Sequence, residues 1–184
     1  ALGGGLPLSA FAGRKKVMMD VAPEGKMMQT GTYVAHLVNI LCGQAFMAAI
    51  TQPGVFEDLK RRSDKLYEGM NRAFGKAGLT ARVKGLGCRF CILFGEPAKK
   101  EPVTYADVAA QDWTMGHRFF AEALRRGVYF HSLWHHGISV AHTDQDIKQV
   151  IQVAEEAAKA VAQTAEGQGK ASGTTGGSDR SMWS

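Results

Sequence analysis

The chain has 184 residues, of which 45% are hydrophobic and 21% are charged, and its formal net charge is +5. This length and apolar content allow one folded domain, or one domain with part of another. No apolar run reaches the ~20 residues of a membrane-spanning helix, so we expect no membrane partner. The two basic clusters, 14–16 and 60–62, are short, and acids alternate with the second, as on a solvated helix face. We therefore expect no nucleic-acid partner.

The chain begins with a glycine-rich turn. The glycines Gly3 to Gly5 permit positive φ angles and a close approach of the backbone. The turn lacks the spacing of a dinucleotide loop and the Gly-Lys-Ser/Thr of a P-loop, which disfavours a nucleotide site. After it, the pattern predicts a strand over 8–12, one or two helical turns over 14–21, and a loop over 23–33.

Two long helices follow, and their patterns differ. Residues 35–50 are apolar on almost every side, which predicts a helix that is deeply buried or lies in an interface. Over 55–77 apolar residues recur at steps of three and four, and Gly78 stands where a C-cap glycine is expected. The second pattern predicts a long amphipathic helix that connects two domains.

From residue 79 the pattern alternates between strands and helices, which indicates a small α+β domain. We expect strands over 80–84, 89–94, 128–130 and 138–141, a largely polar loop with one helical turn over 98–109, and a helix over 111–126 that buries Trp113, Phe120, Ala123 and Leu124. Thr143 is the expected N-cap of a last helix, with Asp144 and Asp146 in its first turn. Its predicted buried stripe is Ile147, Val150, Ile151, Ala154, Ala158 and Val161. The segment 164–184 is rich in small polar residues without periodicity, and we expect it to be a disordered tail.

The cysteines do not predict a metal or redox centre. Cys88 and Cys91 have CxxC spacing, but residues three apart on a strand point to opposite faces, and no second CxxC completes a site. We interpret them as buried structural thiols. Cys42 lies in the apolar helix, and three cysteines cannot all pair, which favours a reducing, cytoplasmic location.

The densest histidine cluster is His131, His135 and His136. Adjacent histidines on an extended loop diverge, and no carboxylate stands beside them at ligand spacing, so the sequence predicts no metal site. An access loop near an active site and plain surface exposure both stay open for these residues. His142 is interpreted as structural, helping to seat the last helix.

Several motifs together point to a known family. They are Gly3–Arg14, Val21-Ala22-Pro23, Gln29-Thr30-Gly31-Thr32, Arg126-Gly127-Val128-Tyr129 and Ser139–Asp144. In this order and at these separations, residues 1–163 resemble the class III pyridoxal-phosphate (PLP) aminotransferases, and within them the glutamate-1-semialdehyde aminomutase branch. The resemblance implies an α/β fold, the C-terminal part of a fold-type I PLP-dependent transferase. Residues 1–53 would end the large domain with an interface loop and helix, 54–78 would be the connecting helix, and 79–163 the small C-terminal domain.

The resemblance also implies a function and a cofactor site. It implies a homodimeric, cytoplasmic, PLP-dependent aminotransferase or aminomutase that acts on small amino acids or amino-aldehydes as donor and acceptor. In this family the Gly-Thr matching Gly31 and Thr32 reaches across the dimer and binds the phosphate of the partner subunit's PLP. The alternative for Thr32 is a turn residue without a ligand.

The catalytic residue of the family is expected outside this chain. Its Schiff-base lysine stands in Lys-x-x-Gly-Gly-Gly, which would place it immediately before Ala1, so we expect no turnover by the chain alone. Two departures leave the choice between aminotransferase and aminomutase open: 130–137 contains no acid, and Val34–Leu37 replaces the family's Ser-Gly-Asn-Pro. A noncatalytic oligomerisation or regulatory module derived from this fold is the alternative function.

Overall fold

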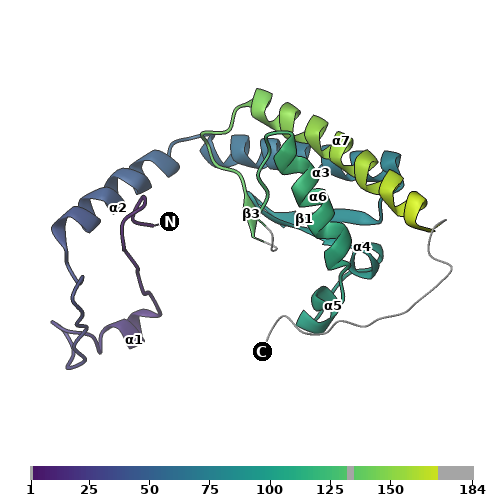
Figure 1. Ribbon diagram of the computed structural model, residues 1–184. Helices are drawn as coiled ribbons and strands as arrows, with labels where there is room; N and C mark the ends of the chain where they lie inside the picture. Colours follow the sequence, from purple (N-terminus) through teal and green to yellow (C-terminus); the bar gives the residue numbers. More distant parts are fainter. Residues whose placement is uncertain (1, 132–134, 170–184) are drawn as a thin grey trace. The chain divides into compact units, whose positions relative to one another are not determined.

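The computed structural model describes residues 2–131 and 135–169 (Figure 1). The chain divides between Phe56 and Glu57 into two compact units, unit 1 on the N-terminal side and unit 2 on the C-terminal side. Among the described residues, no helix has both the length and the apolar character that a membrane crossing requires.

Unit 1 contains two helices, α1 (Lys15–Met18) and α2 (Leu37–Ile50). The glycine-rich turn is closed by a hydrogen bond from the Leu6 N–H to the Gly3 carbonyl, at 3.1 Å. Gly4 and Gly5 take φ angles of 60° and 111°, which glycine adopts readily. The expected strand over 8–12 does not form. A strand needs a hydrogen-bonding neighbour, and the described part of unit 1 offers none to these residues.

Helix α2 anchors the glycine-rich turn. The Asn39 amide donates a hydrogen bond of 2.6 Å to the Pro7 carbonyl. The side chain of Leu8 packs so closely on Gly43 that a Cβ there would lie 2.4 Å from a Leu8 methyl carbon. Asn39 and Gly43 are the buried residues of α2. The turn therefore occupies a narrow face of this helix.

Unit 2 is built on an antiparallel sheet in the order β1-β2-β3. Its strands are β1 (Ala81–Leu86), β2 (Arg89–Phe94) and β3 (His136–Gly137). Most of α3 (Val55–Ala77) lies in this unit, together with α4 (Glu96–Lys99), α5 (Tyr105–Ala109), α6 (Trp113–Arg125) and α7 (Asp144–Gly169). Figure 1 shows α3, α6 and α7 gathered about the sheet.

Close helix contacts and a shared apolar cluster form the core of unit 2. A Cβ at Gly69 of α3 would lie 2.4 Å from Ile151 of α7, and one at Gly116 of α6 would lie 3.1 Å from the Phe94 ring of β2. The largest core side chains with almost no exposure are Phe74, Phe94, Phe119, Leu66, Met70, Leu93 and Ile147. Burial of this apolar surface is the main force that stabilises the unit.

The structure corrects several expectations for unit 2. Residues 128–130 form no strand, and the third strand is His136–Gly137 instead of 138–141. Leu124 is 57% exposed, while Phe119 is the α6 aromatic that is fully buried. The polar segment 98–109 contains the end of α4 and all of α5, which is somewhat more helix than the single expected turn. Helix α7 continues to Gly169, so 164–169 is helical and not disordered; 170–184 lies outside the described residues.

Candidate functional site

The predicted phosphate loop lies between α1 and α2 of unit 1. The Val34 N–H donates to the Gly31 carbonyl at 3.1 Å, which closes a turn around Thr32. Ala35 follows with a positive φ of 56°, and α2 begins two residues later. Gly31 and Thr32 are both exposed. The turn presents them to solvent directly before the helix.

The donors of this turn are available to a ligand. Within the described residues, the N–H groups of Gly31 and Thr32 and the Thr32 hydroxyl have no acceptor. Gly31 has no side chain to hinder an approaching anion. A phosphate group needs several donors at once, and neighbouring backbone N–H groups with a hydroxyl supply them. The residues present at this turn therefore fit a phosphate.

An exposed apolar surface continues from this turn along α2. Its large exposed side chains are Tyr33, Val34, Leu37, Val38, Ile40, Leu41 and Met47. Leu37 is 67% exposed and Tyr33 is 63% exposed. A contiguous apolar surface of this kind is typical of an interaction site. We call these seven residues the α2 apolar surface.

In unit 2 the structure separates the three clustered histidines. His131 and His135 are exposed, but His136 is only 5% exposed, which corrects the expectation of an exposed or access loop for it. Its ring lies 5.1 Å from the ring centroid of Phe90 and 5.5 Å from that of Phe130. The segment 132–134 between these histidines lies outside the described residues.

His136 is electrostatically perturbed. Burial lowers its pKa to about 4, and positive charge on His131, His135 and Arg89 acts in the same direction. Its Nε2 is buried and has no hydrogen-bond partner among the residues that the structure describes. Within the described residues, no three histidine, cysteine or acidic side chains are arranged to hold a metal ion. The imidazole is thus neutral at pH 7 and available to donate or accept one hydrogen bond.

His136 also lines an open cleft of about 440 Å³, formed by β1, β2, β3 and α5. Arg89 and Phe90 of β2, with Tyr105 and Val108 of α5, lie around it. Cys91 lines it too; burial raises the pKa of its thiol, and its Sγ donates to the Lys84 carbonyl at 3.5 Å. The one feature of the sequence that indicates this cleft is an arginine at the start of an otherwise apolar strand.

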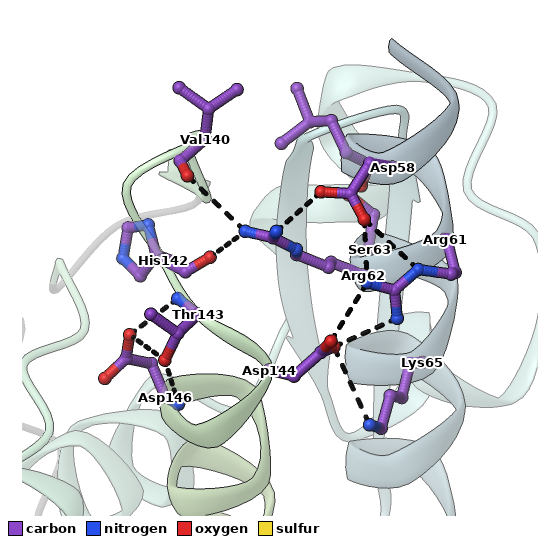
Figure 2. Close-up of polar contacts among 11 residues, drawn as sticks. Asp58, Arg61, Arg62, Ser63, Lys65, Val140, His142, Thr143, Asp144 and Asp146 are labelled. Atoms are coloured by element: carbon purple, nitrogen blue, oxygen red, sulfur yellow. Dashed lines mark hydrogen bonds and ion pairs between the residues drawn. The ribbon is translucent and has the colours of Figure 1, made fainter. Parts of the chain in front are cut away.

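A polar network joins α3 to the start of α7 (Figure 2). Arg62 forms an ion pair with Asp58 at 2.6 Å and donates to the carbonyls of Val140 and His142. Arg61 forms an ion pair with Asp144 at 3.0 Å, and this hydrogen-bonded guanidinium lowers the pKa of Asp144. These contacts hold the segment that leads from β3 into α7.

The N-terminus of α7 is capped as the sequence predicts. The Thr143 hydroxyl accepts from the Asp146 N–H at 3.2 Å, and the Asp146 carboxylate accepts from the Thr143 N–H at 2.6 Å. These bonds lower the pKa of Asp146. The His142 imidazole accepts from the Ser139 N–H at 3.1 Å, in keeping with a structural role beside this helix.

Comparisons with known proteins place these features in a family context. The sequence model of the aminotransferase class-III family matches residues 1–158. Over 152 residues the chain is 36% identical to the glutamate-1-semialdehyde 2,1-aminomutase of Francisella tularensis subsp. tularensis strain WY96-3418, covering 82% of this chain and 35% of that protein. Over 162 residues it is 34% identical to the aminomutase of Desulforudis audaxviator, covering 85% of this chain and 36% of that protein.

Solved structures share the fold. A β-phenylalanine aminotransferase from Variovorax paradoxus matches with a TM-score of 0.76 and 22% identity, covering 92% of this chain and 37% of that one. An omega-transaminase from Sphaerobacter thermophilus matches with a TM-score of 0.72 and 22% identity, covering 88% of this chain and 37% of that one. The chain thus spans little more than a third of the length of the proteins it matches.

Proposed function

The chain belongs to the aminotransferase class-III family, and from this premise we propose that it is part of a PLP-dependent aminotransferase or aminomutase acting on a small amino acid or amino-aldehyde. The observation that carries this proposal is the turn at Gly31 and Thr32. It presents two backbone N–H donors and a hydroxyl together, within the segment that matches the family. Because residues 130–137 contain no acidic residue, the proposal includes both the aminotransferase and the aminomutase reaction.

When bound, PLP supplies an electron sink that stabilises negative charge at the substrate carbon. The part of this chain is to hold the phosphate. Thr32 donates its hydroxyl and N–H to phosphate oxygens, and Gly31 lets the backbone approach them closely. The turn is fixed at its C-terminal side by α2, which begins at Leu37. Fixed donors lose little conformational entropy on binding.

We propose that the phosphate belongs to the partner subunit of a cytoplasmic homodimer. The support is the α2 apolar surface, which follows directly on the turn and leaves Leu37 and Leu41 more than half exposed. A second copy that covers this surface would remove apolar area from water and bring its own cofactor to the turn. The Schiff-base lysine is proposed to precede Ala1 in the intact protein.

The test uses the intact protein. It is incubated with PLP, reduced with borohydride, digested and analysed by mass spectrometry. We expect one lysine, in a Lys-x-x-Gly-Gly-Gly sequence, to carry the reduced cofactor, and amine transfer to be lost when that lysine is replaced. If no lysine is labelled and no amine transfer is measured, the noncatalytic oligomerisation or regulatory module becomes the better interpretation.

The role of Thr32 across the dimer has its own test. Thr32→Ala in the intact protein should weaken PLP binding by about 1.5–3 kcal/mol, because one charge-assisted hydrogen bond is lost. Mixing this variant with a variant that lacks the Schiff-base lysine should restore activity in part, since one of the two sites in a mixed dimer is then intact. Proven subunit exchange without any recovery would show that Thr32 does not act in the partner's site.

A further inference from the structure

The open cleft of unit 2 combines apolar walls with a guanidinium. Val108, half-buried on α5, and Cys91, half-buried on β2, line the cleft together with Tyr105. Arg89 lies beside Phe90, at the first position of β2. The site belongs to unit 2 alone, so the inference does not depend on the proposed function.

The charge of Arg89 is not neutralised by any of the residues that the structure describes. Among residues 2–131 and 135–164, no carboxylate lies within ion-pair distance of its guanidinium. The other cation of the cleft, Lys84, forms an ion pair with Glu101, which also lies 3.7 Å from Arg82. An anion that enters the cleft therefore meets one available guanidinium and one lysine that is already paired.

The strand register holds Arg89 at the cleft. Arg89 pairs with Gly137 across β2 and β3, and a Cβ at residue 137 would lie 3.3 Å from both Cδ and Nη1 of Arg89. The side chain of Arg89 thus passes directly over the glycine backbone. The neighbouring pair is Phe90 with His136, and because successive residues of a strand point to opposite faces, these two side chains lie on the core face of the sheet and Arg89 lies on the other face.

We propose that this cleft binds a small organic carboxylate with an apolar or aromatic body. The carboxylate pairs with the Arg89 guanidinium, which presents two parallel N–H donors. The body lies against Val108, Cys91 and the ring of Tyr105.

The same observations disfavour other ligands. An inorganic phosphate would need more donors than one guanidinium, and it would leave the apolar walls in contact with a dianion. A neutral apolar ligand would use the walls but not the unpaired charge. A volume of about 440 Å³ is in the range of small-molecule pockets, and an aromatic acid fits within it.

The test measures binding of three probes to the full 184-residue chain by isothermal titration calorimetry and by amide chemical shifts. Phenylacetate carries both the ring and the charge, phenylacetamide carries only the ring, and acetate carries only the charge. We expect phenylacetate to bind at least ~10-fold more tightly than either of the others, since a charge-assisted pair and the apolar contact each contribute. The shifted amides should be those of β2, β3 and α5.

Arg89→Gln should reduce phenylacetate affinity by at least ~10-fold and leave the weak binding of phenylacetamide unchanged. The matched control is Arg72→Gln, which removes another exposed arginine, on α3, that is 3.6 Å from Glu68 and does not line the cleft. The Arg72→Gln variant should bind phenylacetate with the same affinity as the unchanged chain. Equal affinities for phenylacetate and its amide, or an unchanged affinity in Arg89→Gln, would overturn the proposal.

Discussion

Helices α2 and α6 are both rich in apolar residues, but the structure uses them differently. In α6, Phe119 and Ala123 are fully buried against the core of unit 2. In α2, the apolar side chains of Leu37 and Leu41 are more than half exposed, and the buried positions are Asn39 and Gly43. Unit 2 thus buries one apolar face of α6 in its own core, whereas the α2 apolar surface stays exposed in this chain and would be covered in the proposed dimer.

The polar groups differ between the units in the same way. In unit 2 the charges at the α3–α7 junction are paired, as Arg62 with Asp58 and Arg61 with Asp144, although the buried Nε of Arg62 has no hydrogen-bond partner among the described residues. In unit 1 the Gly31 and Thr32 donors have no acceptor within the described residues. Paired polar groups stabilise a fold, and unpaired exposed donors are available to a ligand. The predictions below test this difference.

The largest expected effect is in the core of unit 2. Phe119→Ala should lower the free energy of unfolding by about 3–5 kcal/mol, because it leaves a cavity beside Phe74, whose ring centroid is 5.3 Å away. The matched change in unit 1 is Leu37→Ala, which should cost less than about 0.5 kcal/mol in the 184-residue chain. The free energies of unfolding of the two variants are compared by urea denaturation, monitored by circular dichroism. A large loss in Leu37→Ala would mean that this chain already covers α2.

The next effect depends on pH. The pKa of His136 falls from 6.5 to about 4 on folding, so the unfolded chain binds more protons between these values. Its contribution to stability is complete above pH 6.5 and is lost as pH falls toward 4, by up to about 3 kcal/mol. His131, His135 and Arg89 face the same ring and add to the loss.

The measurement is the urea midpoint of the chain and of His136→Phe at several pH values from 7 to 4. The variant should lose less stability over this range, because phenylalanine does not titrate and the site is lined by aromatic rings. His117→Phe, at an exposed position of α6, is the control and should follow the unchanged chain. Identical pH profiles for His136→Phe and the unchanged chain would contradict the assigned environment of His136.

A smaller effect is expected at the α3–α7 junction. Arg62→Gln should cost about 1.5–3 kcal/mol, because it breaks the ion pair with Asp58 and removes the donor from the His142 carbonyl. The arginine side chain is 18% exposed, so water replaces these bonds poorly. Lys60→Gln is the control, since Lys60 and Asp64 are 70% and 50% exposed and such pairs contribute less than about 1 kcal/mol. Equal losses would show that the junction is as solvated as the surface.

The sequence predicted the features that depend on local signals. Helix α3 matches the expected range 55–77, because its apolar period and the Gly78 C-cap lie within the segment itself. The Thr143 cap is equally local. The family and the fold type are confirmed by the aminotransferase class-III match and by the transaminase structures. The roles of Gly31 and Thr32 stay predictions.

Features that depend on distant contacts were missed. The strand expected over 8–12 has no neighbouring strand within the described residues. The buried face of α6 was misassigned because Phe119 and Leu124 are both apolar, and only the position of Phe74 decides which of them is inside. His136 is buried by Phe90 and Phe130, and its contact with Phe90 joins residues 46 positions apart in the sequence. Local patterns carry no information on such pairs.

The smallest expected effect is at the phosphate turn itself. Thr32→Val in the 184-residue chain removes the hydroxyl but keeps the branched shape, and it should change the free energy of unfolding by less than about 0.5 kcal/mol. The hydroxyl is exposed and has no acceptor within the described residues, so water solvates it equally well in the folded and unfolded chain. The urea midpoint measures this, and Thr143→Val is the control, since its hydroxyl caps α7 and its loss should cost about 1 kcal/mol. A loss at Thr32 as large as that at Thr143 would mean that the hydroxyl is used within the fold, and the proposed phosphate contact would lose its donor.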